Sequence, residues 1–215
     1  MIIFDCDGVL VDSEIISNAI DAELMTEAGW PVTASDLIRN YIGRPKAEIW
    51  ADIAGQRGEE WPVGLLDRAD RLLLERMETE LRPVEGIADA LRRLPQRKAV
   101  ASSSALPKLR RSLKICGLLD FFEPAVFSAS QVARGKPAPD VFLFAAKQCG
   151  VDPDDCVVLE DSVAGVTAAL AAGMRVFGFA GGLHSYPGHR ENLLNAGAER
   201  VADNADALSE DFFTV

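Results

Sequence analysis

The sequence lacks the cysteine spacing of a disulfide-bonded or zinc-binding protein. Its four cysteines, Cys6, Cys116, Cys149 and Cys156, form neither a CxxC pair nor any other paired framework. Disulfide scaffolds and structural zinc sites depend on such spacings, so we expect reduced thiols and a cytoplasmic protein. Cys6 lies between two aspartates, whose charges raise a thiol pKa and make this cysteine a poor nucleophile.

Long apolar runs and an excess of positive charge are also missing. No run approaches the roughly 18 apolar residues of a membrane span, and the N-terminus has no basic segment or signal-type cleavage site. Lysine and arginine number 22 against 33 aspartates and glutamates, a net charge of -11. Because proteins that bind nucleic acid cluster Lys and Arg, we expect neither a membrane nor a nucleic acid as partner.

Residues 14–82 read as helical throughout. Apolar residues recur at helical spacing over 14–28, a second helix begins at Thr33, and a short one ends near Ile53, before a glycine-containing break at 55–58. The clearest helix carries its leucines on one face between Leu65 and Leu81. This block has no strand signal, so we interpret it as an insertion.

From Pro83 onward, helix and strand patterns alternate. Strands are expected at 98–101, 125–127, 156–159 and 175–179, and helices at 87–94, 106–115, 141–148 and 163–172, with an edge strand at 200–202 and a closing helix at 205–212. Together with the apolar opening run, this pattern is typical of an α/β fold, a doubly wound parallel sheet. We predict an α/β catalytic core of residues 1–13 and 83–215 and a helical cap domain of residues 14–82.

The opening run ends in Asp5-Cys6-Asp7-Gly8. Residues i and i+2 of an extended segment point the same way, so Asp5 and Asp7 can face one cavity, and Gly8 allows a tight turn beyond them. Two carboxylates held this close favour a hard cation such as Mg²⁺, which also binds substrate phosphates. The alternative is an acidic turn in which Asp7-Gly8 serves only as turn chemistry.

Polar residues follow the other expected strands as well. These are Ser102-Ser103-Ser104, Gly135-Lys136-Pro137 and Glu160-Asp161-Ser162. Ligands of open parallel sheets bind outside the carboxyl ends of the strands, so these groups should become neighbours. Acids, a hydroxyl and a lysine supply the metal ligands, anion donors and nucleophile of phosphoryl transfer.

Each group also has a purely structural interpretation. Ser102 could cap the next helix, Lys136 could lie on the surface as most lysines do, and Glu160 and Asp161 could be acids of a first helical turn. Their recurrence at the same end of successive strands argues against coincidence.

The two histidines, His184 and His189, fall in a glycine-rich stretch without a GxSxG or HExxH partner. A serine triad and a zinc site are therefore unsupported. We interpret both as loop residues.

Four ordered motifs resemble the signature of the haloacid dehalogenase-like hydrolase superfamily: Asp5-x-Asp7-Gly8-Val9-Leu10-Val11-Asp12-Ser13, Ser102 at a strand end, Gly135-Lys136-Pro137-x-Pro139-Asp140, and Glu160-Asp161-Ser162-x-x-Gly165. The resemblance covers essentially the whole chain. Within the superfamily the chain is similar to the sugar-phosphate phosphatase and β-phosphoglucomutase branch, and its first motif looks most like that of bacterial 6-phosphogluconate phosphatases.

The resemblance implies a role for each motif residue. Asp5 would be the nucleophile that forms an aspartyl phosphate, and Asp7 the general acid and base. Ser102, Ser103 and Lys136 would hold the phosphoryl group. The Mg²⁺ ligands would be Asp5, the backbone carbonyl of Asp7, Asp161 and, directly or through water, Glu160. In the cap, Lys46 and Arg44 match the place where relatives contact the far end of the substrate.

The expected activity is Mg²⁺-dependent hydrolysis of a small phosphorylated metabolite by a monomer or weak homodimer. Asp7 argues against a dehalogenase proper or a phosphonatase, which lack this aspartate. Ser17 stands where the familiar β-phosphoglucomutases carry a cap histidine, so a phosphomutase is the second possibility. A catalytically silent metabolite-binding protein is the third, although such proteins typically lose residues equivalent to Asp7 or Lys136.

Overall fold

Two units make up the fold. The structure is a computed structural model that describes residues 1–41 and 46–214. One unit comprises Met1–Asp12 and Arg82–Val215, and the other comprises Ser13–Leu81. Among the described residues, none of the helices combines the length and apolar character that crossing a membrane requires.

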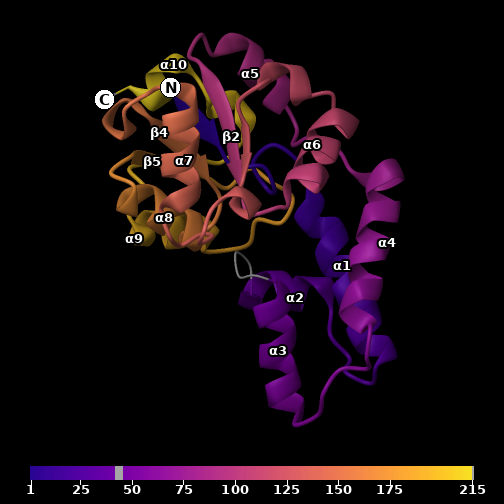
Figure 1. The fold of residues 1–215 in the computed structure, drawn as a ribbon. Coiled ribbons are helices and arrows are strands. Elements are labelled where there is room, and N and C mark those ends of the chain that lie inside the picture. Colours follow the sequence, from indigo (N-terminus) through magenta and orange to yellow (C-terminus); the bar gives the residue numbers. More distant parts are fainter. Residues whose placement is uncertain (42–45, 215) are drawn as a thin grey trace. The chain divides into compact units, whose positions relative to one another are not determined.

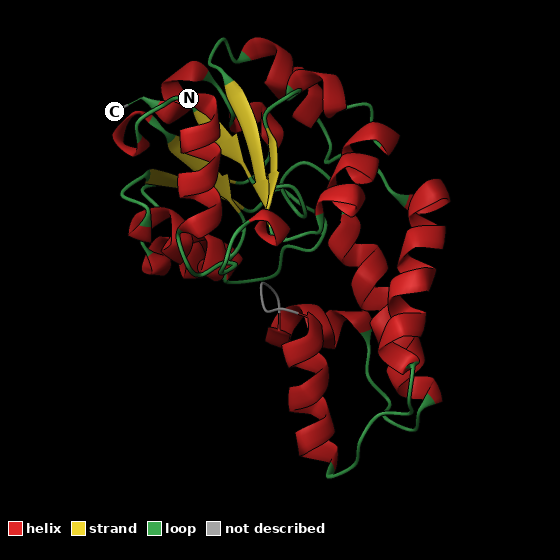
Figure 2. Ribbon diagram, in the orientation of Figure 1, coloured by secondary structure: helices red, strands yellow, loops and turns green. Residues whose placement is uncertain are grey.

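A six-stranded parallel sheet forms the centre of the larger unit (Figure 2). Its strands are β1 (Ile2–Phe4), β2 (Lys98–Ser102), β3 (Val126–Ser128), β4 (Val157–Glu160), β5 (Arg175–Phe179) and β6 (Val201–Ala202), in the order β3-β2-β1-β4-β5-β6. The predicted α/β class with a doubly wound parallel sheet is confirmed. Because β1 is central, with β2 and β4 on either side, the residues that follow these three strands emerge side by side.

Helices cover both faces of this sheet (Figure 1). They are α5 (Ile87–Arg93), α6 (Leu106–Ile115), α7 (Asp140–Cys149), α8 (Val163–Ala171), α9 (His189–Ala196) and α10 (Glu210–Phe213), with 3-10 turns at Leu119–Phe121, Ala129–Gln131, Pro153–Asp155 and Ala205–Ala207. Alternate strand residues point to opposite faces. Ile3 and Val158 pack with Phe142 of α7 and Leu193 of α9 on one face, whereas Phe4 on the other contacts Phe122.

The smaller unit is helical, with α1 (Ser13–Glu27), α2 (Ala34–Tyr41), α3 (Lys46–Arg57) and α4 (Leu65–Glu80). The predicted start of the second helix is confirmed by a reciprocal cap. The amide of Asp36 donates to Thr33 Oγ1 at 3.1 Å, and the amide of Thr33 donates to Asp36 Oδ2 at 3.2 Å. The buried face of α4 carries Leu65, Ala69, Leu73 and Met77, as its periodicity predicts.

The end of the third helix was predicted too early in the chain, at a break over residues 55–58. Helix α3 continues through Gly55 to Arg57. Tertiary contacts hold this last turn, because the Arg57 guanidinium donates to the Ala28 carbonyl at 3.2 Å and lies 4.2 Å from the centroid of the Trp61 ring. Such contacts outweigh the roughly 1 kcal/mol helical cost of one glycine.

The C-terminal prediction also needs correction. The stretch 205–212 is not one helix, since Asn204 caps a 3-10 turn and Ser209 caps the separate helix α10. Helix α9 was missed altogether. Within α9 only His189 and Leu193 are buried. Two positions are too few to produce the recurring apolar residues by which an amphipathic helix is recognised in a sequence.

Candidate active site

The turn after β1 starts the site. The amide of Asp5 donates to the Leu159 carbonyl of β4 at 2.9 Å, which fixes Asp5 at the carboxyl end of the sheet. Gly8 has φ +86°, and a Cβ there would lie 2.2 Å from Asp161 Oδ2. The predicted tight turn is confirmed, and any side chain at Gly8 would displace Asp161.

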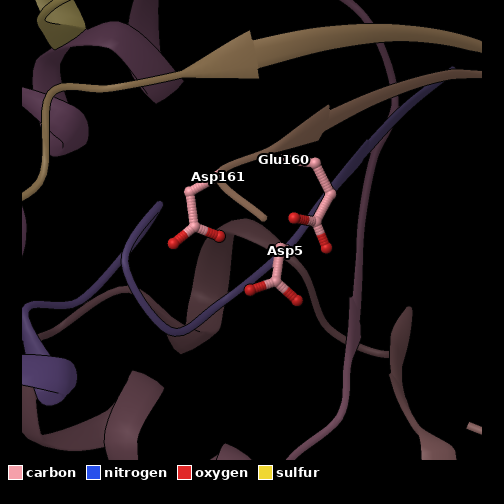
Figure 3. Close-up of side chains that lie close together, drawn as sticks. All are labelled: Asp5, Glu160 and Asp161. Atoms are coloured by element: carbon pink, nitrogen blue, oxygen red, sulfur yellow. The ribbon is translucent and has the colours of Figure 1, made fainter. Parts of the chain in front are cut away.

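Three buried carboxylates meet beyond β1 and β4. Asp5, Glu160 and Asp161 each offer an oxygen, and these oxygens lie within 4.8 Å of one another (Figure 3). Negative charges crowded in a buried space repel one another unless a cation lies among them. Oxygen donors of this kind suit Mg²⁺, so the residues present fit the ion that the sequence predicts.

Lys136 lies against this carboxylate cluster. Its Nζ is 2.5 Å from Asp5 Oδ1, 2.7 Å from Glu160 Oε1 and 3.0 Å from the Ala101 carbonyl, and its side chain is buried. The interpretation of Lys136 as a surface residue is therefore wrong. A loop that begins beyond β3 brings this positive charge to the end of β1.

Burial and neighbouring charges shift the pKa values here. Burial raises the pKa of Asp5 well above its ordinary value, opposed by Lys136 and reinforced by Glu160, Asp161 and Asp7. Burial by itself lowers the pKa of Lys136, but the ion pairs with Asp5 and Glu160 outweigh it and raise that pKa. Both ion pairs thus favour the charged form of Lys136.

Glu160 is held on both oxygens. Its Oε1 faces Lys136, and its Oε2 accepts from the amide of Ser162 at 2.7 Å and from its hydroxyl at 2.9 Å. Ser162 is the N-cap of α8, so Glu160 and Asp161 precede the helix and are not first-turn acids. A Cβ at Gly165 would lie 1.7 Å from Glu160 Oε1, which explains a glycine in the fourth motif.

Asp7 has its own partners. Its Oδ2 accepts from Ser104 Oγ at 2.7 Å and from Ser102 Oγ at 3.3 Å, and Lys108 Nζ lies 3.8 Å from its Oδ1. Helix α6 begins after Ala105 without a side-chain cap, so the interpretation of Ser102 as a helix cap is wrong. Ser102 instead points toward the site, where its hydroxyl contacts Asp7. These contacts involve the side chain of Asp7, whereas the predicted metal ligand is its backbone carbonyl.

Sequence reasoning missed two of these partners. Ser104 Oγ contacts both Asp7 and Lys108 Nζ, the latter at 3.1 Å. Ser104 stands in the second motif, but nothing in the spacing separates it from Ser103, which is exposed. Lys108 resembles any first-turn surface lysine until the fold brings it near Asp7.

Of the two predicted cap cations, the structure describes Lys46. Lys46 begins α3 and forms ion pairs within the smaller unit, with Asp21 Oδ1 at 3.0 Å and Asp70 Oδ1 at 3.4 Å. It is therefore not a freely solvated cation. Arg44 lies outside the described residues.

The prediction that both histidines are loop residues is confirmed for His184 and wrong for His189. Both are buried, and His189 is the first residue of α9. His184 Nε2 lies 2.8 Å from Asp161 Oδ2, beside the carboxylate cluster. All four cysteines are free, as expected, and burial, more than the two aspartates, raises the pKa of Cys6.

A parallel sheet whose strand ends gather carboxylates, serines and a lysine defines a class of hydrolase, and comparison with known proteins agrees. The family model of the haloacid dehalogenase-like hydrolases matches residues 1–173. A conserved haloacid dehalogenase-like protein of unknown function from Agrobacterium tumefaciens is 41% identical, with a TM-score of 0.91, over 96% of this chain and 94% of that one. The chain belongs to the haloacid dehalogenase-like hydrolase family.

Two further relatives carry information about chemistry. The 6-phosphogluconate phosphatase of Escherichia coli (strain K12) is 29% identical over 187 residues, 86% of this chain and 85% of that protein. A haloacid dehalogenase family hydrolase from Deinococcus radiodurans, solved with bound phosphate and sodium, is 33% identical, with a TM-score of 0.81, over 96% of this chain and 92% of that one. The predicted family, its sugar-phosphate phosphatase branch and the class of phosphoric monoester hydrolase are confirmed.

Proposed function

We propose that the protein is a Mg²⁺-dependent phosphatase that hydrolyses a small phosphorylated metabolite, a sugar phosphate or sugar-acid phosphate, through an aspartyl phosphate on Asp5. The observation that carries the proposal is the buried cluster of Asp5, Glu160 and Asp161 with Lys136 against it. It combines a nucleophile, a cation-binding donor set and a fixed positive charge at one point.

In the first step, a carboxylate oxygen of Asp5 attacks phosphorus and the bond from phosphorus to the ester oxygen breaks. Asp7 gives its proton to the leaving alcohol. In the second step, water attacks the aspartyl phosphate, its proton passes to Asp7, and inorganic phosphate leaves with Asp5 restored. Splitting one hydrolysis into two displacements lowers the barrier of each.

The surroundings of Asp7 suit a group that alternates between acid and base. Hydroxyl groups of Ser102 and Ser104 donate to its carboxylate. These hydroxyls can rotate, so Asp7 can be stabilised as a carboxylate and also lose or gain a proton. Lys108 Nζ lies 3.8 Å from the other oxygen, Oδ1.

The phosphoryl group would be held by Ser102, Ser103 and Lys136. Their donors oppose the charge that spreads over the phosphoryl oxygens in the transition state. Mg²⁺, held by Asp5, Asp161, the backbone carbonyl of Asp7 and Glu160, would neutralise the same charge when bound. Both oxygens of Glu160 are already engaged, Oε1 by Lys136 and Oε2 by Ser162, so Glu160 would act through a water or by sharing these contacts.

The substrate class rests on the phosphatase named among the relatives and on the helical unit. We propose that residues 14–82 serve as a cap that excludes bulk water during turnover. Lys46 is the proposed contact to the part of the substrate distant from phosphate. This role would require Lys46 to give up or share its ion pairs with Asp21 and Asp70.

The decisive experiment measures phosphate release from p-nitrophenyl phosphate with Mg²⁺ and with excess chelator. Activity should require the metal and return when Mg²⁺ is restored. Full activity in chelator would exclude the metal role, and no activity under any condition would favour a silent binding protein. Conversion of β-glucose 1-phosphate with a bisphosphate activator would indicate a phosphomutase instead. A panel of phosphorylated metabolites ranked by kcat/KM then identifies the substrate.

A further inference from the structure

His184 is fixed in orientation beside the carboxylate cluster. It follows β5 in the chain, its side chain is fully buried, and its Nε2 lies 2.8 Å from Asp161 Oδ2. At this distance the imidazole forms an ion pair with the Asp161 carboxylate when it is protonated. A Cβ at Gly182 would lie 2.7 Å from His184 Nδ1, and one at Gly8 would lie 2.5 Å from Cε1. Two glycines therefore make room for this ring.

His189 contacts the same aspartate from its backbone side. Its Nε2 lies 2.6 Å from the Asp161 carbonyl oxygen, which only accepts, so this nitrogen must donate. Its Nδ1 lies 3.1 Å from Ser185 Oγ, and Tyr186 stacks on the ring with centroids 4.9 Å apart. The ring is thus held on its edge and its face.

We propose that His184 and His189 are positioning residues for Asp161, one holding its carboxylate and the other its peptide carbonyl. The inference rests on the proposed Mg²⁺ site. Figure 3 shows one carboxylate oxygen of Asp161 directed toward Asp5 and Glu160 and the other directed away. With one oxygen engaged by His184, a single oxygen of defined direction is presented to a cation.

The physical effect is preorganisation. An aspartate that rotates freely beside two other negative groups must lose that freedom each time a cation binds. A donor fixed behind it removes this cost and selects one rotamer. Partners of this kind behind a metal-binding carboxylate typically contribute about 10–100-fold in metal affinity or activity.

If His184 served only to fill space in the core, a different result would be expected. Filling the space of the imidazole with an apolar side chain would then preserve the site and affect only stability. The discriminating readout is therefore the affinity for a cation in the absence of substrate, measured beside the thermal melt. Mn²⁺ is a suitable probe, because it takes the same oxygen ligands as Mg²⁺ and its free ion can be followed by electron paramagnetic resonance.

The test compares His184→Leu with the wild-type protein and with Leu193→Ala, a buried apolar residue in α9. We expect His184→Leu to weaken Mn²⁺ binding by about 10–100-fold. His189→Leu should weaken it less, since His189 touches only the backbone of Asp161. Leu193→Ala should lower Tm and leave the Kd for Mn²⁺ unchanged.

Two polar variants keep the test valid if His184→Leu does not fold. The amide nitrogen of glutamine reaches the position of Nε2, whereas that of asparagine matches Nδ1. His184→Gln should therefore retain Mn²⁺ affinity and His184→Asn should lose it. Equal affinities of these two variants, or wild-type affinity in His184→Leu, would overturn the inference alone. A wild-type protein that binds no Mn²⁺ would overturn the proposed metal site with it.

Discussion

Each unit of the molecule contains a lysine between two carboxylates, and the two lysines differ in what surrounds them. Lys136 of the larger unit is 4% exposed, between Asp5 and Glu160, which are 10% and 1% exposed. Lys46 of the smaller unit is 22% exposed, and one of its partners, Asp70, is 63% exposed. The same pairing of charges is thus buried in one place and half-solvated in the other.

The two clusters therefore differ in what they can bind. Around Lys136 the carboxylates outnumber the cation, because Asp161 adds a third acid within reach. Buried charge that is not balanced favours uptake of a further cation. Around Lys46 water screens part of the charge, so the pair acts mainly to connect α1, α3 and α4. Burial therefore distinguishes a cluster that can take up a further cation from one that connects helices.

The largest expected effect is that of Asp5→Asn. Loss of the nucleophile should lower kcat by roughly 10³–10⁶-fold. Tm should not fall, because the amide has the shape of the carboxylate and adds no charge to a crowded site. Phosphate release and a thermal melt measure the two effects. The matched control is Asp21→Asn in the other cluster, which should keep most of the activity. If Asp5→Asn retains more than a trace of activity, the nucleophile is misassigned.

Lys136→Met should have the next largest effect, on stability as well as activity. Removing one partner of a buried ion pair costs about 3–5 kcal/mol. Urea unfolding in chelator should reveal this loss, and Mg²⁺ should restore part of it by replacing the missing positive charge. A loss below about 1 kcal/mol, the range of exposed pairs, would mean that the two clusters do not differ as described.

The smallest effect is expected for Lys46→Met. It leaves the buried Asp21 without its cation, at a cost of about 1–3 kcal/mol that Mg²⁺ should not restore. Asp70→Asn, at the exposed end, should stay within about 1 kcal/mol of the wild-type protein. KM supplies the second readout: if Lys46 contacts substrate, KM should rise in Lys46→Met and not in Asp70→Asn. An unchanged KM in both variants would remove Lys46 from the proposed site.

Much of the larger unit could be predicted because its information is local. Apolar runs gave the strands, and the end of each run identified the residues at the carboxyl edge of the sheet. Asp5, Ser102, Glu160 and Asp161 follow from that rule alone, since parallel neighbours bring their ends together. The helix α6 was predicted with the bounds that the structure has, Leu106–Ile115.

The features that the sequence did not reveal depend on contacts between residues that are distant in the chain. Lys136 was predicted to join the site, but the burial of its side chain depends on Asp5, which lies far before it in the chain. His184 lies in a turn as predicted, but its burial against Asp161 and two glycines could not be read from the sequence. Ser104 and Ser103 are equivalent in the sequence, and only the direction of the chain after β2 separates them.

The sequence by itself determined which chemical groups this protein has and which strand ends carry them, because periodicity and turn residues act over a few positions. The tertiary structure alone decided which lysine is buried, which serine faces Asp7 and that two histidines lie behind Asp161. Those outcomes depend on burial and on the approach of distant segments, and no pattern of neighbouring residues records either.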